Sequence, residues 1–270
     1  MAEDLRLGVI GIGKMGGIIV RSIAGTVFPA RHVWVTDLDT TLVEQLCDEK
    51  GINSTTDIQT LVEKTDVILC AVPPPAIPHI LPQVACNLST SQSLISIAAG
   101  VTTTTLESYF DTPPPVIRVM PNIAASVGAA ISVLTTGSAA NETHLSIAEK
   151  IFNACGTFLV MDERHLDAVT GVSGSGPAYV ALFIEALADA GVHVGLPRTD
   201  AQKLATHTVL GAATMLADTQ EHPATLKNRV TTPGGTTAAG LHALEKGGLR
   251  ATLTEAILAA TQRAKELGST

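Results

Sequence analysis

The first group of residues that could do chemistry is a set of three glycines near the start of the chain. Gly11, Gly13 and Gly16 form a G-x-G-x-x-G pattern directly after a short apolar run that we expect to be a strand. In such a loop the glycines permit a tight turn, a close backbone approach to a pyrophosphate and close packing of helix on strand. Asp37 follows at the spacing, about 20 residues, that is typical of a ribose-binding acid. A tight turn with a solvated aspartate is the alternative, and the combined spacing favours dinucleotide binding.

A second group of small residues could hold a carboxylate. Thr232 precedes a Pro-Gly-Gly turn, and Gly234, Gly235, Thr236 and Thr237 open a predicted helix that runs to about residue 246. Successive backbone N–H groups at a helix start form an anion site. The alternative is an ordinary helix cap, for which threonine and glycine are common. The physical argument alone leaves the two equally supported, although one cap needs fewer threonines than this segment contains.

A third motif, at residues 171–180, has the spacing G-x-x-G-x-G. It resembles the segment of β-hydroxyacid dehydrogenases that precedes a catalytic lysine, but Val180 occupies the lysine position. The sequence therefore predicts no general acid or base for an alcohol oxidation. The eight histidines are scattered, and no Ser-His-Asp arrangement or metal-spaced cluster is present. Reduction of a protonated imine needs no protein acid, because hydride addition to an iminium gives a neutral amine directly.

The elements that must position these residues alternate between strands and helices in the first part of the chain. Uncharged strands in such an alternation predict a parallel sheet that helices cover on both faces. We expect strands at 7–10, 33–36, 67–72, 93–98, 116–120, 130–134 and 157–160, and helices at 17–24, 42–50 and 142–154.

After about residue 163 the pattern changes to helices alone. Pro177 suits the first position of a helix over 178–190, and Gly191 suits its end. This helix is apolar on almost every face, which predicts burial on every face and a second subunit as the cover. We therefore expect a dinucleotide-binding domain at 1–162 and a helical domain for dimerisation and substrate binding at 163–270.

Composition excludes several classes of function. The 270 residues carry a net charge of −8 without a basic run, which argues against binding to nucleic acid or to an anionic membrane surface. Only 16% of residues are charged and 46% are hydrophobic, which favours an oligomer. We expect no membrane span, no signal peptide and, because the four cysteines show no CxxC spacing, no metal site. These features predict a cytoplasmic protein.

Taken together, these segments resemble pyrroline-5-carboxylate reductases over nearly the whole chain. The most specific segment is 226–244, with Thr-Pro-Gly-Gly-Thr-Thr at its centre. The other segments that carry the resemblance are 11–16, Ala71-Val72, 96–101, 118–122, 173–179 and Glu221-His222-Pro223.

The resemblance implies an N-terminal Rossmann domain, a C-terminal helical dimerisation domain, and dimers that can assemble further, up to decamers. It implies reduction of 1-pyrroline-5-carboxylate to L-proline by hydride from NAD(P)H, the last step of proline synthesis. Gly234 to Thr237 would hold the substrate carboxylate, the Thr237 hydroxyl would contact the ring nitrogen, and Glu163 would line the site. The cofactor-binding residues implied are Ile10, Gly11, Ile12, Gly13, Lys14, Met15, Gly16, Asp37, Ala71, Val72, Pro73, Ile97, Ala98, Ala99, Met120, Pro121 and Asn122, with 97–99 and 120–122 flanking the nicotinamide.

The chain departs from the family pattern at three places. Pro73 stands where the family usually has lysine, Ile123-Ala124 replaces Thr-Pro, and the asparagine expected near residue 57 is missing, although Asp57 could substitute. The missing lysine and the carboxylate at Asp37 favour NADH over NADPH. The alternatives are a related cyclic-imine reductase and a catalytically inactive dinucleotide sensor, and the intact Gly-Gly-Thr-Thr segment argues against the sensor.

Overall fold

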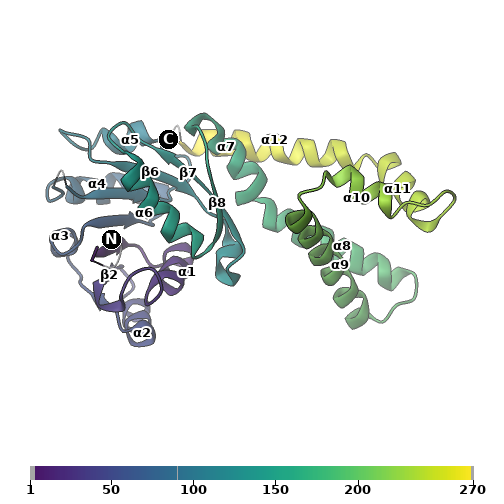
Figure 1. Ribbon diagram of the computed structural model, residues 1–270, viewed down its shortest axis with the longest axis horizontal. Helices are drawn as coiled ribbons and strands as arrows, with labels where there is room; N and C mark the ends of the chain where they lie inside the picture. Colours follow the sequence, from purple (N-terminus) through teal and green to yellow (C-terminus); the bar gives the residue numbers. More distant parts are fainter. Residues whose placement is uncertain (1–3, 90, 269–270) are drawn as a thin grey trace. The chain divides into compact units, whose positions relative to one another are not determined.

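A computed structural model of the chain describes residues 4–89 and 91–268 (Figure 1). Its contacts divide the chain into two compact units. The first unit extends to Ser175 and takes in the chain again from Ala259 onward, and the second unit is Gly176–Leu258. This division falls at other residues than the predicted domain boundary between 162 and 163, so that boundary stays a prediction.

The first unit is built on one mainly parallel sheet, which confirms the α/β fold class predicted from the sequence. Among the described residues the sheet has eight strands in the order β3-β2-β1-β4-β5-β6-β7-β8. The strands are β1 (Leu7–Ile10), β2 (Val33–Thr36), β3 (Asn53–Ser54), β4 (Val67–Cys70), β5 (Ser93–Ser96), β6 (Val116–Met120), β7 (Ala130–Thr136) and β8 (Gly156–Val160).

Helices cover both faces of this sheet (Figure 1). One apolar core joins the sheet to α1, α2 and α6, and the other joins it to α3, α4 and α5. Four of these helices begin at side-chain caps that the sequence supplies. The capping side chains each accept backbone N–H groups of the first turn and belong to Asp39, Asp57, Thr102 and Asn141. The helices of this unit are α1 (Lys14–Ile23), α2 (Thr40–Lys50), α3 (Ile58–Glu63), α4 (Ile77–Ala85), α5 (Thr103–Glu107), α6 (Glu142–Asn153) and α7 (Leu166–Val169).

The last two strands, β7 and β8, run against the other six, which corrects the expectation of a wholly parallel sheet. β7 pairs with β6 in the antiparallel sense, whereas β8 is again parallel to β7. The connection between β6 and β7 is residues 121–129, which form only a 3-10 turn, η3 (Ile123–Val127). A parallel crossover needs a dozen or more residues, so this short connection forces the reversal.

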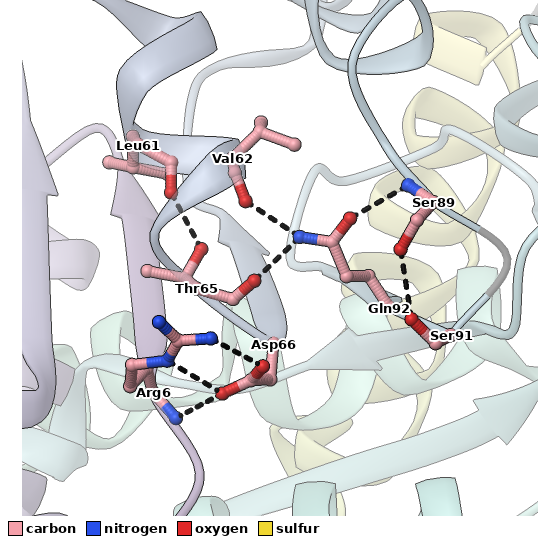
Figure 2. Close-up of polar contacts among 8 residues, drawn as sticks. All are labelled: Arg6, Leu61, Val62, Thr65, Asp66, Ser89, Ser91 and Gln92. Carbon is pink, nitrogen blue, oxygen red and sulfur yellow. Dashed lines mark hydrogen bonds and ion pairs between the residues drawn. The ribbon is translucent and has the colours of Figure 1, made fainter.

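The amino-terminal edge of the sheet is fastened by polar contacts (Figure 2). The Arg6 side chain donates to both carboxylate oxygens of Asp66, at 3.1 and 3.0 Å. Burial by itself would raise the pKa of Asp66, but the hydrogen bonds and charge of Arg6 outweigh it and hold that pKa below its ordinary value. Gln92 donates to the carbonyls of Val62 and Thr65, which ties the start of β5 to the end of α3. These contacts hold the ends of the strands opposite to the glycine loop.

The second unit is helical, as predicted. Its helices are α8 (Gly176–His193), α9 (Arg198–Thr219), α10 (Pro223–Arg229), α11 (Thr236–Lys246) and the first part of α12 (Leu249–Gly268), whose end belongs to the first unit. The expected end of α8 at Gly191 is wrong, because the helix continues to His193. A Cβ added at Gly191 would lie 3.1 Å from the Cβ of Ala201 on α9, so this glycine permits close packing of α8 on α9.

The apolar surface of α8 is only partly covered within one chain. Ala188 is buried, but Leu182 is 65% exposed and Phe183 is 44% exposed. The expected burial on every face is therefore not achieved by the single chain. No helix in the described part of the chain is long and apolar enough to span a membrane.

Candidate active site

The glycine loop lies at the carboxyl end of β1 and has the backbone conformation that the sequence predicted. Gly11 adopts a φ of +90°, which side-chain-bearing residues rarely adopt. A Cβ at Gly16 would lie 2.0 Å from the carbonyl oxygen of Gly11, so the turn from β1 into α1 has no room for a side chain there. Gly13 differs, because a Cβ there would meet no described atom within 4 Å. The protein itself therefore requires Gly11 and Gly16, and Gly13 leaves open space at the start of α1.

This open space suits an anion. Gly13 is the N-cap residue of α1, and no side chain in the described part of the chain caps the helix. The N–H groups of a helix start carry a partial positive charge and bind phosphate where backbone can approach it. Lys14 is exposed and Met15 partly buried beside this start, while Ile12 is buried in the core.

Asp37, which the sequence predicts to bind ribose, lies beside the loop. It follows the carboxyl end of β2, and its Oδ2 accepts the backbone N–H of Ile12 at 2.6 Å. Its Oδ1 accepts the N–H of Asp39 at 3.0 Å. The carboxylate is therefore fixed in orientation at the loop, whereas the neighbouring Asp39 carboxylate accepts N–H groups at the start of α2.

The other predicted cofactor segments meet the loop at the same edge of the sheet. Ile10 ends β1, and its carbonyl accepts the N–H of Ala71, which follows β4, at 2.8 Å. Val72 lies against Gly11, since a Cβ added to that glycine would lie 3.0 Å from Cγ1 of Val72. The remaining residues lie at or just after the carboxyl ends of β4, β5 and β6 and comprise Pro73, Ile97, Ala98, Ala99, Met120, Pro121 and Asn122. The parallel order β2-β1-β4-β5-β6 thus brings them to one edge, across the point where strand order reverses.

Asn122 makes a contact that sequence reasoning did not predict. The residue is 9% exposed, and its Nδ2 donates to the carbonyl oxygen of Ser173 at 3.2 Å. Its Oδ1 is buried and has no hydrogen-bond partner among the described residues. Ser173 belongs to a π-helical turn, η5 (Thr170–Gly174), and a Cβ at Gly174 would lie 2.7 Å from Cε of Met120. The glycine-rich third motif therefore packs, through its first part, against residues 120–122.

Glu163, which the resemblance places at the site, is held by protein donors. Its carboxylate accepts the N–H and hydroxyl of Thr103 at 2.7 and 2.6 Å and the Arg118 guanidinium at 2.9 Å. Burial would raise the pKa of Glu163, but these hydrogen bonds and the Arg118 charge outweigh it and lower that pKa. Arg118 is 4% exposed and lies on β6, two residues before Met120. Asp57 likewise has a local role, because its side chain caps α3.

The Gly-Gly-Thr-Thr turn lies in the second unit. Gly234 has a φ of +69°, and the Gly235 N–H donates to the Thr232 carbonyl at 3.0 Å. The N-cap residue of α11 is Gly235, and no described side chain caps this helix. No threonine side chain caps the helix, although glycine is itself a common N-cap residue, so the ordinary-cap alternative stays open. The hydroxyls of Thr232, Thr236 and Thr237 stand at a helix start whose N–H groups can bind an anion.

Comparisons with known protein families, sequences and structures agree with one another. Residues 163–267 match a family model described as pyrroline-5-carboxylate reductase dimerisation, and residues 6–100 match one described as NADP oxidoreductase, coenzyme F420-dependent. A pyrroline-5-carboxylate reductase of Arabidopsis thaliana is 43% identical over 98% of this chain and 96% of its own. The solved pyrroline-5-carboxylate reductase of Coxiella burnetii has a TM-score of 0.92 at 32% identity, over 98% of this chain and 99% of that one. That of Plasmodium falciparum, solved with NADP bound, has a TM-score of 0.88 at 31% identity, over 99% of this chain and all of that one.

The glycine loop, the strand order and the edge residues define an oxidoreductase that uses a dinucleotide cofactor. More specifically, the chain belongs to the pyrroline-5-carboxylate reductase family. This confirms the family predicted from the sequence, and the comparisons do not favour a different cyclic-imine reductase or an inactive sensor.

Proposed function

We propose that residues 232–237 hold the carboxylate of the substrate, 1-pyrroline-5-carboxylate, while it is reduced to L-proline with NAD(P)H. The reaction is that of the family, whose members include the Arabidopsis and Coxiella proteins. The observation that supports this role is that no side chain caps the start of α11, because its N-cap residue is Gly235. The N–H groups of Gly234 to Thr237 then bind the carboxylate, and Thr232 and Thr236 add hydroxyl donors.

The Thr237 hydroxyl would accept the N–H of the protonated ring nitrogen. Hydride adds to the carbon of the C=N bond, and the electron pair of that bond moves to nitrogen. The product is a neutral amine, so no protein group has to donate a proton in this step. Such a site can stabilise the transition state through N–H and hydroxyl dipoles that are already oriented toward the substrate.

The first unit fits a nicotinamide dinucleotide, which supplies the hydride when bound. Residues 10–16 would hold the pyrophosphate, because Gly13 leaves space at an uncapped helix start. Asp37 would accept hydrogen bonds from the ribose hydroxyls. Residues 71–73 would contact the dinucleotide from the end of β4, and residues 97–99 and 120–122 would flank the nicotinamide from the ends of β5 and β6.

We also infer a preference for NADH. The Asp37 carboxylate is fixed beside the loop by the N–H groups of Ile12 and Asp39, where it would face a 2′-phosphate of like charge. Pro73 offers no cation in place of the usual lysine.

A homo-oligomer built from dimers, with further assembly up to a decamer, accounts for the exposed apolar side chains of α8. Leu182 and Phe183 lie within the residues that match the dimerisation model of the family. A second copy of this chain would remove them from water.

Steady-state kinetics of two variants test the proposed role of Thr237 in substrate binding. Thr237→Val keeps the side-chain shape and removes the hydroxyl, and we expect kcat/KM for 1-pyrroline-5-carboxylate to fall about 10- to 1000-fold with near-normal dinucleotide affinity. Thr231→Val is the matched control, since the Thr231 hydroxyl donates to the Lys227 carbonyl at 2.6 Å. The five-membered imine should also be preferred over its six-membered homologue. Equal kinetics for the Thr237 variant and the unmodified enzyme would contradict the assignment.

A further inference from the structure

The buried amide oxygen of Asn122 is a hydrogen-bond acceptor that the protein does not satisfy by itself. The side chain is 9% exposed, and among the described residues Oδ1 has no donor. A buried polar atom without a partner is unfavourable, so most such atoms in folded proteins are paired with protein, water or ligand.

The orientation of this amide is fixed from the other side. Nδ2 donates to the Ser173 carbonyl, and a flipped amide would place two acceptors against each other. In a regular helix the carbonyl of residue 173 would accept from the N–H of residue 177, but Pro177 has no N–H. Asn122 supplies the donor that Pro177 lacks. Because Nδ2 of Asn122 fills the place of the missing Pro177 N–H, Oδ1 is the amide atom that is left without a hydrogen-bond partner among the described residues.

The position of Asn122 indicates the kind of donor it can meet. The residue follows β6 at the carboxyl edge of the sheet, on the far side of β1 and β4 from Asp37. A dinucleotide lies across the point where the strand order reverses, so the half opposite the Asp37-bound ribose reaches the ends of β5 and β6. All of these elements belong to the first unit.

We propose that Oδ1 of Asn122 accepts a hydrogen bond from the carboxamide N–H of the nicotinamide. This inference rests on the proposed function and names a positioning residue for it. A carboxamide hydrogen-bonded in this way cannot rotate freely, which fixes the face of the ring that is turned to the substrate. The Ser173–Pro177 segment thereby acts on the cofactor through Asn122 without touching it.

Binding of two reduced cofactors in the absence of substrate tests the contact. The 3-acetylpyridine analogue of NADH keeps the carbonyl and replaces the N–H₂ group by a methyl group. By isothermal titration calorimetry the unmodified protein should bind NADH about 2- to 13-fold more tightly than the analogue, the range for one hydrogen bond. In Asn122→Ala the affinity for NADH should fall by a similar factor, and the two cofactors should bind equally well.

Asn87→Ala is the matched control, because Asn87 also donates from Nδ2 to a carbonyl, that of Gln83 in α4 at 2.9 Å. This variant should keep the ratio of the affinities for NADH and the analogue that the unmodified protein has. Equal binding of NADH and the analogue by the unmodified protein would refute the proposal. So would an Asn122→Ala variant that still binds NADH more tightly than the analogue by the same factor. Failure of the proposed function would show itself differently, as normal NADH binding without oxidation when 1-pyrroline-5-carboxylate is added.

Discussion

Replacing Asp37 by asparagine should shift the coenzyme preference of this reductase toward NADPH. The carboxylate accepts the N–H of Ile12 through one oxygen and that of Asp39 through the other. It can therefore turn away from a 2′-phosphate only by losing these bonds, each worth about 0.5–1.5 kcal/mol. Asparagine removes the charge and keeps one oxygen that can accept the Ile12 N–H.

The size of the shift follows from the charges. A 2′-phosphate carries a charge of about −1.5 to −2 near neutral pH. At roughly 5 Å from one carboxylate, in a medium of effective dielectric constant about 40–80, the repulsion is about 1–3 kcal/mol. This free energy corresponds to a change of roughly 5- to 150-fold in the ratio of the kcat/KM values for NADPH and NADH.

The assay compares both coenzymes at saturating 1-pyrroline-5-carboxylate and low salt, where electrostatic effects are least screened. Asp39→Asn is the matched control, because Asp39 is also an acid near the loop but its Oδ1 accepts the N–H groups of Thr41 and Leu42 in α2. We expect this control to change the ratio less than threefold, in keeping with a screened surface charge. An unchanged ratio in Asp37→Asn, or an equal shift in the control, would refute the reasoning.

Three further outcomes are expected. Glu163→Gln should lower the free energy of unfolding by about 1–3 kcal/mol at pH 7, because Arg118 stays buried without its anion. The loss in denaturant titrations should shrink below the ordinary glutamate pKa of 4.5, since a carboxyl with a lowered pKa loses its stabilisation as pH falls through that pKa. Leu182→Glu should give a smaller particle by light scattering, and an unchanged mass would place the interface elsewhere. Gly13→Ala should keep the melting temperature and weaken dinucleotide binding at least tenfold, whereas Gly16→Ala should destabilise the fold itself, because its Cβ would lie 2.0 Å from the Gly11 carbonyl oxygen.

The sequence predicted the glycine turn and the position of Asp37 beside it, because both depend on local geometry. The Gly11–Gly16 spacing is dictated by one turn, and Asp37 by the end of the next strand, so both could be recognised from neighbouring residues. The Asn122–Ser173 contact joins residues 51 positions apart, and no local pattern specifies it. The available signal was Pro177, which we interpreted only as a helix start, although its missing N–H also leaves a carbonyl in need of a donor.

Two errors in the expected fold arose because a local sequence pattern does not report what lies far away along the chain or how long a connection is. Gly191 has the residue type of a helix end, but its function is to admit α9, and this depends on Ala201 in another helix. The direction of β7 depends on the length of one connection, which a pattern of uncharged strands does not report. Packing against α9 overrode the local propensity of Gly191 to end α8, and the short connection after β6 determined the direction of β7.

Glu163 does not serve as a proton donor at neutral pH. Its lowered pKa keeps it ionised at neutral pH, so it holds no proton to donate, and its carboxylate accepts bonds from Thr103 and Arg118. Its anion thereby neutralises the buried cation on β6 just before residues 120–122. The remaining groups proposed to act on cofactor and substrate, the Asn122 amide and the N–H groups of residues 234–237, do not titrate. A reaction that adds hydride to an already protonated imine needs such fixed dipoles and no proton relay.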